Sequence, residues 1–317
     1  MKLRLLLFLF SIVLFISCSS SLRNSAGNNN SKVFDQPVIE QPDITASQPT
    51  ALTDLSRTND GGFVLSPGFY ETEFKTYCLQ PGTPDPRKGD AYLQAPVSGY
   101  RKEMVESILL NSRKKPAMEQ RHIQLLLWCV VSGGNYNKLS HAVRSDAAQL
   151  LTPKQIFELK GGVMGMVKNF SYASGILNAN NDLQRLFDAG SNAYEIFEKT
   201  AVLKEQAQMK RPDIKYDQWY KQKENYYIRY FPVNYQKVKI QVYVPDGLLD
   251  ADGKAEGKYI VYDPTGLQAV PANTNAQRLG IGAPVLDIIK IIIETNGTNH
   301  TPEKLPGKNA KETKTLL

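Results

Sequence analysis

The spacing of apolar residues predicts helices in the middle of the chain. Between residues 101 and 205 these residues recur at intervals of three and four, the period of an α-helix with one buried side. Residues 152–155 read Thr-Pro-Lys-Gln, a capping box with proline at the first helical position, so one helix should begin at Pro153. The stretch predicts a compact domain of about five or six short helices.

After Pro212 the period of the apolar positions changes to two. Val238, Ile240 and Val242 alternate with polar residues, which is typical of a strand with one buried face. Further strands are expected on either side, because a lone hairpin is not stable in water. The predicted strands are 226–231, 238–244 and 258–263, with a hairpin connection at 232–235, and the helix predicted to cover them is 284–294.

The two periods together predict an α+β fold, in which a helical domain is followed by a small antiparallel β-sheet domain with a covering C-terminal helix. Residues 61–100 are rich in glycine, proline and aromatic residues and are assigned to an N-terminal loop, although 69–79 fits a strand equally well. The predicted divisions are a signal peptide at 1–17, a disordered tether at 18–60, the mainly helical domain at 61–209, the sheet domain at 210–295 and a disordered basic tail at 296–317.

The first 17 residues have the pattern of a secretory signal. Lys2 and Arg4 give a positive start, and an apolar stretch follows at residues 5–16. This stretch is too short to cross roughly 30 Å of hydrocarbon as a helix, at about 1.5 Å per residue. Export from the cytoplasm is therefore expected.

Residues 15–18, Phe-Ile-Ser-Cys, end this signal and resemble the lipobox of bacterial lipoproteins. The resemblance covers only the first 18 residues and implies that Cys18 becomes the first mature residue, carrying a diacylglyceryl thioether and an N-acyl chain such as palmitate. More than one acyl chain makes membrane anchoring stable. Ordinary cleavage between Ser17 and Ser21, with Cys18 unmodified, is the alternative.

The residues after Cys18 bear on where such an anchor would lie. They lack the acidic run that resembles a surface-export tag in lipoproteins of the Bacteroidota, and Ser19 is not the aspartate associated with retention in the inner membrane. The resemblance therefore implies an outer membrane protein that faces the periplasm, with the cell surface as the alternative.

Composition excludes several classes of protein. The chain has 317 residues, of which 42% are hydrophobic and 22% charged, so it is neither wholly disordered, collagen-like nor a polytopic membrane protein. Loss of residues 1–17 removes Lys2 and Arg4 and lowers the formal net charge from +7 to about +5. Such a mild excess favours anionic partners or serves solubility alone. An exported protein is not expected to bind nucleic acid.

Motifs for metals and cofactors are missing from the sequence. The histidines are far apart and form no HExxH or Cys/His cluster. Residues 280–282 read Gly-Ile-Gly, but Val285 stands where a dinucleotide fingerprint has its third glycine, and no GxSxG motif occurs. Neither a metal nor a cofactor is expected.

Four carboxylates between residues 71 and 90 are the candidates for catalysis. They lie near several tyrosines, and a pair of carboxylates beside aromatic rings is the arrangement that cleaves glycosidic bonds. Surface loops commonly carry such residues, so the alternative is that they only solvate the loop. The candidates are Glu71, Glu73, Asp85 and Asp90.

Aromatic and basic residues alternate between residues 216 and 243. In an exported protein this mixture favours binding of a glycan or a protein partner, because the rings supply contact area and the cations reach acidic groups. The alternative is that the rings pack the core and pair across strands. The residues predicted to bind are Trp219, Tyr220, Tyr227 and Arg229.

Two cysteines besides Cys18 remain, Cys78 and Cys129. An oxidising envelope would permit a disulfide between them. Cys129 lies within an apolar run, where a small buried side chain is the commoner role. A redox function of Cys78 would need an exposed thiol of low pKa, and no CxxC motif is present.

The sequence thus predicts a lipid-anchored envelope protein that is not an enzyme. Its expected role is to bind or assemble a cell-wall glycan or another envelope protein through the aromatic strands. The alternative is a periplasmic hydrolase of peptidoglycan or polysaccharide that uses the loop carboxylates.

Overall fold

The predicted hairpin lies at the centre of the fold. In the computed structural model its strands are β9 (Tyr227–Asn234) and β10 (Lys237–Val244), which pair antiparallel with Tyr230 opposite Ile240. β9 extends past Pro232, and the register of its pairing with β10 shifts between Lys237 and Val238. The β-branched residues of β10 all face inward and are fully buried, as their period of two predicts.

The other neighbour of β10 is the longest strand, β4 (Gly68–Cys78), which pairs antiparallel with it from Lys75 opposite Lys237 to Gly68 opposite Val244. This is the segment whose period the apolar residues leave undecided. Thr72 and Thr76 occupy buried inward positions of β4, and Phe69 lies on its outward side. Hydrophobicity therefore does not alternate cleanly along a strand that is nevertheless central.

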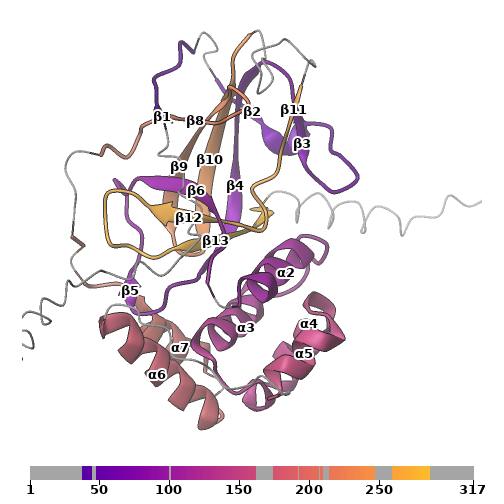
Figure 1. Ribbon diagram of the computed structural model, residues 1–317, viewed down its shortest axis with the longest axis vertical. Helices are drawn as coiled ribbons and strands as arrows, with labels where there is room; N and C mark the ends of the chain where they lie inside the picture. The colour runs from indigo at the N-terminus through magenta and orange to yellow at the C-terminus, as the bar shows by residue number, and fades with distance from the viewer. Residues whose placement is uncertain are drawn as a thin grey trace, which may run out of the picture. The chain divides into compact units, whose positions relative to one another are not determined.

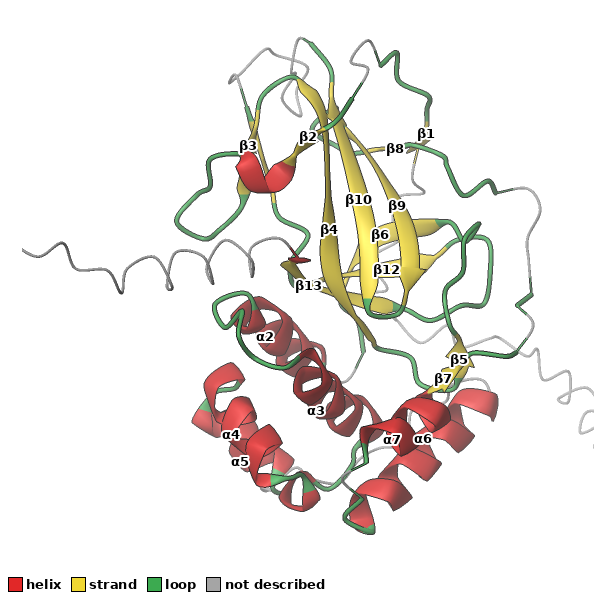
Figure 2. Ribbon diagram, turned by 180° about the vertical axis from the view of Figure 1, so that it is seen from behind, coloured by secondary structure: helices red, strands yellow, loops and turns green. Residues whose placement is uncertain are grey.

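Nine strands form one sheet, ordered β1-β8-β9-β10-β4-β13-β12-β6, with β2 pairing parallel to β4. The sheet is curled into a half-barrel, because the Tyr230 hydroxyl on β9 donates to Oε1 of Gln94 on β6 at 2.6 Å although four strands separate them in the order. Figure 2 shows β4, β10 and β9 side by side, with β6 and β12 crossing behind them. The remaining strands are β1 (Val38–Ile39), β2 (Thr50–Ala51), β3 (Phe63–Leu65), β5 (Thr83–Pro84), β6 (Tyr92–Pro96), β7 (Val202–Leu203), β8 (Tyr220–Lys221), β11 (Ile260–Tyr262), β12 (Leu267–Pro271) and β13 (Leu279–Pro284).

Six α-helices are described, and they gather at one end of the long strands (Figures 1 and 2). Both hydrogen bonds of the capping box between Thr152 and Gln155 are present, and the helix begins at Pro153, as predicted. Gly133 ends the most apolar helix with φ of 74°, a left-handed conformation that suits glycine. The helices are α2 (Lys102–Ser112), α3 (Gln120–Ser132), α4 (His141–Leu150), α5 (Pro153–Leu159), α6 (Ser174–Asp188) and α7 (Tyr194–Ala201), with short 3₁₀ helices at Leu52–Asp54 and Tyr136–Lys138.

Polar side chains of α3 join the helices to the sheet. The buried amide of Gln124 accepts from the Cys78 backbone N–H at 2.8 Å and donates to its carbonyl at 3.0 Å. Gln120 donates from Nε2 to the carbonyls of Thr76 and Gln236. Beyond the last pair with β10, the Cys78 end of β4 therefore hydrogen-bonds to a helix side chain on that side, which satisfies buried backbone groups.

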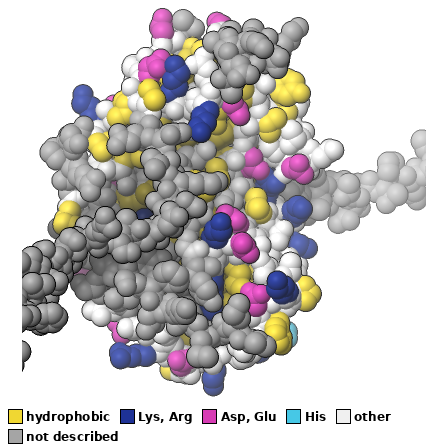
Figure 3. All heavy atoms as spheres, viewed as in Figure 1, with side chains coloured by type: hydrophobic (Ala, Val, Ile, Leu, Met, Phe, Trp, Pro, Cys, Tyr) yellow, Lys and Arg dark blue, Asp and Glu magenta, His cyan; other side chains and the backbone are white. Residues whose placement is uncertain are grey.

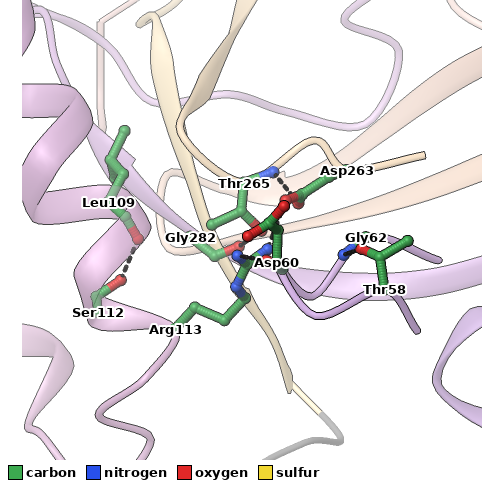
Figure 4. Close-up of polar contacts among 9 residues, drawn as sticks. All are labelled: Thr58, Asp60, Gly62, Leu109, Ser112, Arg113, Asp263, Thr265 and Gly282. Atoms are coloured by element: carbon green, nitrogen blue, oxygen red, sulfur yellow. Dashed lines mark hydrogen bonds and ion pairs between the residues drawn. The ribbon is translucent and has the colours of Figure 1, made fainter. Parts of the chain in front are cut away.

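A second connection joins α2 to the small sheet of β3 and β11. Figure 4 shows Arg113, which follows α2, between Asp60 and Asp263. Its guanidinium forms an ion pair with the Asp263 carboxylate at 2.5 Å and also donates to the Asp60 carbonyl. Gly61 has φ of 89°, and a Cβ there would meet the guanidinium carbon at 2.8 Å, so both its backbone and its space favour glycine.

The predicted order of a helical domain followed by a small sheet domain is wrong. The chain is mostly a large curled antiparallel sheet, and its strands β4, β6, β12 and β13 come from both sides of the helices in sequence. Residues 260–262 form a strand, but it pairs with β3 outside the large sheet. The prediction failed because Thr72 and Thr76 at inward positions of β4, Phe69 at an outward position and the glycines of β13 hide the strand period.

The structure describes residues 38–44, 48–99, 101–161, 174–191, 193–206, 208–209, 214–246 and 259–285, all within one unit that begins at Val38. The signal peptide, Cys18, the covering helix beyond Val285 and the basic tail lie outside these residues. The later part of the segment predicted as a tether contains β1, β2 and a 3₁₀ helix.

Candidate binding face on the outside of the sheet

The outward side chains of β4, β10 and β9 form three rows across the sheet, called here the outer face. Glu71, Gln241 and Arg229 make the middle row, because Gln241 lies opposite both of the others. One row beyond, Lys239 lies between Glu73 and Phe231. The third row contains Phe69, Tyr243 and Tyr227. Cross-strand neighbours on one face are about 4.5–5.5 Å apart at Cβ, which lets these side chains act together.

The middle row is a continuous chain of hydrogen bonds. Nε of Arg229 donates to Oε1 of Gln241 at 2.7 Å, and Nε2 of Gln241 donates to Oε2 of Glu71 at 2.7 Å. The guanidinium also lies 4.2 Å from the centre of the Trp219 ring, close enough for a cation–π contact. Burial lowers the pKa of Arg229, although the group stays charged at any physiological pH.

The next row is more accessible and mixes charge with an aromatic ring. The ammonium of Lys239 lies 5.4 Å from the centre of the Phe231 ring and 3.6 Å from Oε2 of Glu71. Lys237 forms an ion pair with Glu73 at 3.0 Å. The four charged side chains keep 33–40% of their area exposed, so this part of the outer face is open to a partner. Tyr216, also exposed, packs edge-on against Phe231.

The three aromatic side chains predicted to bind are all buried. Trp219 is 1% exposed, Tyr220 3% and Tyr227 5%. Tyr220 lies opposite Ile228 on the inward side, and burial raises its pKa to about 12. Trp219 packs edge-on against Phe69 beneath Arg229. Of the predicted binding residues, only Arg229 is partly accessible.

Residues 38–44, called here the strap, cover part of the outer face. The strap pairs β1 with β8, and the carboxylate of Glu40 accepts from the Tyr227 hydroxyl at 2.7 Å and from the Lys221 ammonium at 3.0 Å. The Tyr243 hydroxyl donates to the Asp43 carbonyl at 2.8 Å. These contacts explain why Tyr227 is buried although it points outward.

The structure brings Glu71 and Glu73 together with Arg229, but it places the other two candidate carboxylates elsewhere. Asp85 accepts from the Tyr235 backbone N–H in the β9–β10 turn at 2.9 Å, and burial is the main cause that raises its pKa. Asp90 is buried and accepts from the Arg87 backbone and from Gln208. The four carboxylates therefore form no common site.

Cys78 and Cys129 are both buried and both free. Burial raises the pKa of each thiol to about 12, so neither is a reactive thiolate near neutral pH. Within the described ranges, no three His, Cys, Asp or Glu side chains could hold a metal ion, and no helix is long and apolar enough to cross a membrane.

Sequence reasoning missed two members of this site. Gln241 joins Arg229 to Glu71, and the period of two along β10 already placed it outward beside Lys239. Glu40 had no such signal, because 187 positions separate it from Tyr227. Comparison of the chain with protein-family models, characterised proteins and solved structures finds no match. The function proposed below therefore rests on the geometry of this chain alone.

Proposed function

We propose that this protein is a lipid-anchored protein of a bacterial envelope that binds a partner through the outer face of its sheet. The anchor is Cys18, in the outer membrane and facing the periplasm, as the lipobox resemblance implies. The partner is another envelope protein or a cell-wall glycan. The observation that carries the proposal is the accessible row of Glu73, Lys239 and Phe231 beside the ordered pair of Arg229 and Gln241.

The chemistry of this face favours binding over catalysis. Glycoside cleavage uses one protonated carboxyl and one carboxylate on either side of the bond. Here Glu73 forms an ion pair with Lys237, and Glu71 contacts Lys239 and Gln241, so both carboxylates are already engaged by neighbouring side chains. Charges of both signs next to a partly exposed ring instead suit recognition of a polar surface.

The side of the molecule seen in Figure 3 has a mixed charged surface. On the face seen in Figure 3, acidic and basic side chains are interspersed, with no large patch of one sign among the described residues. Such mixing is ordinary for a soluble surface. The proposal therefore concerns the outer face, where the side chains are ordered by cross-strand contacts.

The test is crosslinking and affinity capture of the lipidated protein from its native envelope. A Phe231→Ala, Lys239→Ala double variant should lose the captured partner, whereas a Tyr259→Ala, Lys160→Ala variant, altered at exposed residues elsewhere, should retain it. The Cys18→Ala chain is the control for localisation. Equal capture by the wild-type chain and the outer-face variant would contradict the proposal. If the wild-type chain cleaves peptidoglycan or polysaccharide and Glu71→Gln abolishes this activity, the hydrolase alternative is favoured.

A further inference from the structure

The strap meets the sheet through the chemistry of a peptide backbone. Val38 pairs with Lys221 and Ile39 with Tyr220 in an antiparallel ladder, and the Glu40 N–H donates to the Trp219 carbonyl at 3.4 Å. The Tyr243 hydroxyl binds the carbonyl of Asp43. Main-chain bonds of this kind are how extended peptides add to a sheet edge.

A carboxylate clamp sets the register of the strap. Both oxygens of Glu40 are bound, one by Tyr227 and the other by Lys221, and the Lys221 ammonium also lies 5.7 Å from the centre of the Tyr227 ring. These hydrogen bonds and the nearby ammonium lower the pKa of Glu40. Pro42, two residues on, is the buried residue of the strap. The site thus selects an acidic residue at one position of an extended chain.

The strap is held weakly for a structural strand. β1 has two residues, and the Val38 and Ile39 side chains are 56% and 52% exposed, so they bury little apolar area. Glu40 and Lys221 are themselves partly exposed, and exposed ion pairs contribute little to stability. Beneath the strap, the buried indole N–H of Trp219 has no hydrogen-bond partner among the described residues. A competing strand would therefore displace few stabilising contacts.

We infer that the strap occupies a peptide-docking site, and that the partner's segment is an extended strand with an acidic residue after two apolar ones. The strap is then a built-in substitute for the partner, which it keeps out until it is displaced. This inference rests on the proposed function and narrows its partner class to a protein. Because the strap belongs to the same chain, it competes for the site at an effective concentration in the millimolar range. A partner segment can displace it only by binding more tightly than the strap does.

The test uses the full mature chain and a fluorescent synthetic peptide of residues 38–44 as the probe. In the Glu40→Ala chain the strap loses its clamp, and the peptide should bind about tenfold more tightly than to wild type, because less of the competitor is seated. Adding Lys221→Met and Tyr227→Phe to Glu40→Ala should weaken that binding about tenfold, since charged hydrogen bonds are lost. A peptide with Glu40→Gln should bind weakly to every chain.

Each other outcome overturns the inference. Unchanged hydrogen exchange of the β1 and β8 amides in Glu40→Ala would show that Glu40 does not hold the strap. Opening of the strap without peptide binding would show that the covered edge is no docking site. If Glu40→Ala instead gains affinity for cell-wall glycan, the partner is not a peptide, although the proposed function stands. If the wild-type chain forms a dimer and the peptide dissociates it, the site belongs to a second copy of this chain.

The proposed function can fail separately from this inference. If the peptide binds as expected but the native envelope yields no partner dependent on the outer face, the docking site remains and the envelope role is lost. If a partner is captured through Phe231 and Lys239 while the peptide never binds, the envelope role remains and the docking site is lost.

Discussion

The helix–sheet junction and the outer face use the same residue types for opposite purposes. At the junction, Trp128 lies 5.6 Å from Tyr194 and 6.4 Å from Tyr235 between ring centres, and the two tyrosine hydroxyls are 2.8 Å apart. The outer face also combines tyrosines, glutamates and a lysine, with Trp219 packed against it. The junction is buried by helices, whereas the strap and residues 216–219 cover only part of the outer face and leave Glu71, Glu73 and Lys239 partly exposed. Burial, and not residue type, therefore separates the packing cluster from the candidate site.

The largest expected effect is at the junction. Trp128 is fully buried, so Trp128→Ala should lower the free energy of unfolding by about 3–5 kcal/mol through lost packing and the cavity left behind. Phe231→Ala, on the outer face, should cost about 1 kcal/mol or less. Guanidinium denaturation of the two variants measures the contrast. Equal losses would mean that the outer face is part of the core.

The next effect concerns one hydroxyl of the junction. Tyr235 donates to Oε1 of Glu198 at 2.6 Å and contacts the Tyr194 hydroxyl, so Tyr235→Phe should destabilise the protein by about 1–3 kcal/mol. Tyr216→Phe removes the same atom from an exposed ring and should change stability by less than about 0.5 kcal/mol. Thermal unfolding of both would show whether the hydroxyl matters only where it is buried.

A smaller effect depends on pH. Burial raises the pKa of Asp85, which means that the fold holds the protonated carboxyl better than the carboxylate. Asp85→Asn keeps an oxygen for the Tyr235 N–H and removes the charge, so the variant should be more stable than wild type at neutral pH. The difference should shrink as the pH falls through the raised pKa of Asp85. Unfolding midpoints across this range that stay parallel would refute this account.

The smallest expected change in stability is on the outer face. Glu71→Gln and Lys239→Met each remove one member of a partly exposed pair, so the unfolding free energy should change by at most about 1 kcal/mol. The same variants should weaken partner capture. Chemical denaturation alongside capture separates the two roles, and a loss of stability as large as that of Trp128→Ala would assign these residues to the core.

Much of the local structure follows from the sequence. The capping box at Thr152, the stop at Gly133 and the period of two along β10 each depend on residues near in sequence, and each appears in the structure. The order of domains could not be predicted in this way, because β4 carries threonine and β13 carries glycine at buried positions where larger apolar residues would have marked a strand. Their assignment depends on partners far along the chain.

The candidate site divides in the same way. The sequence by itself determined that aromatic and basic residues alternate along 216–243 and that Lys239 and Gln241 share one side of a strand. Only the tertiary structure decided that Glu71 and Glu73 lie beside them, that Asp85 and Asp90 do not, and that Glu40 covers Tyr227. Alternation is a property of one strand's backbone, whereas register between strands and burial are set by contacts between distant segments, which no local pattern records.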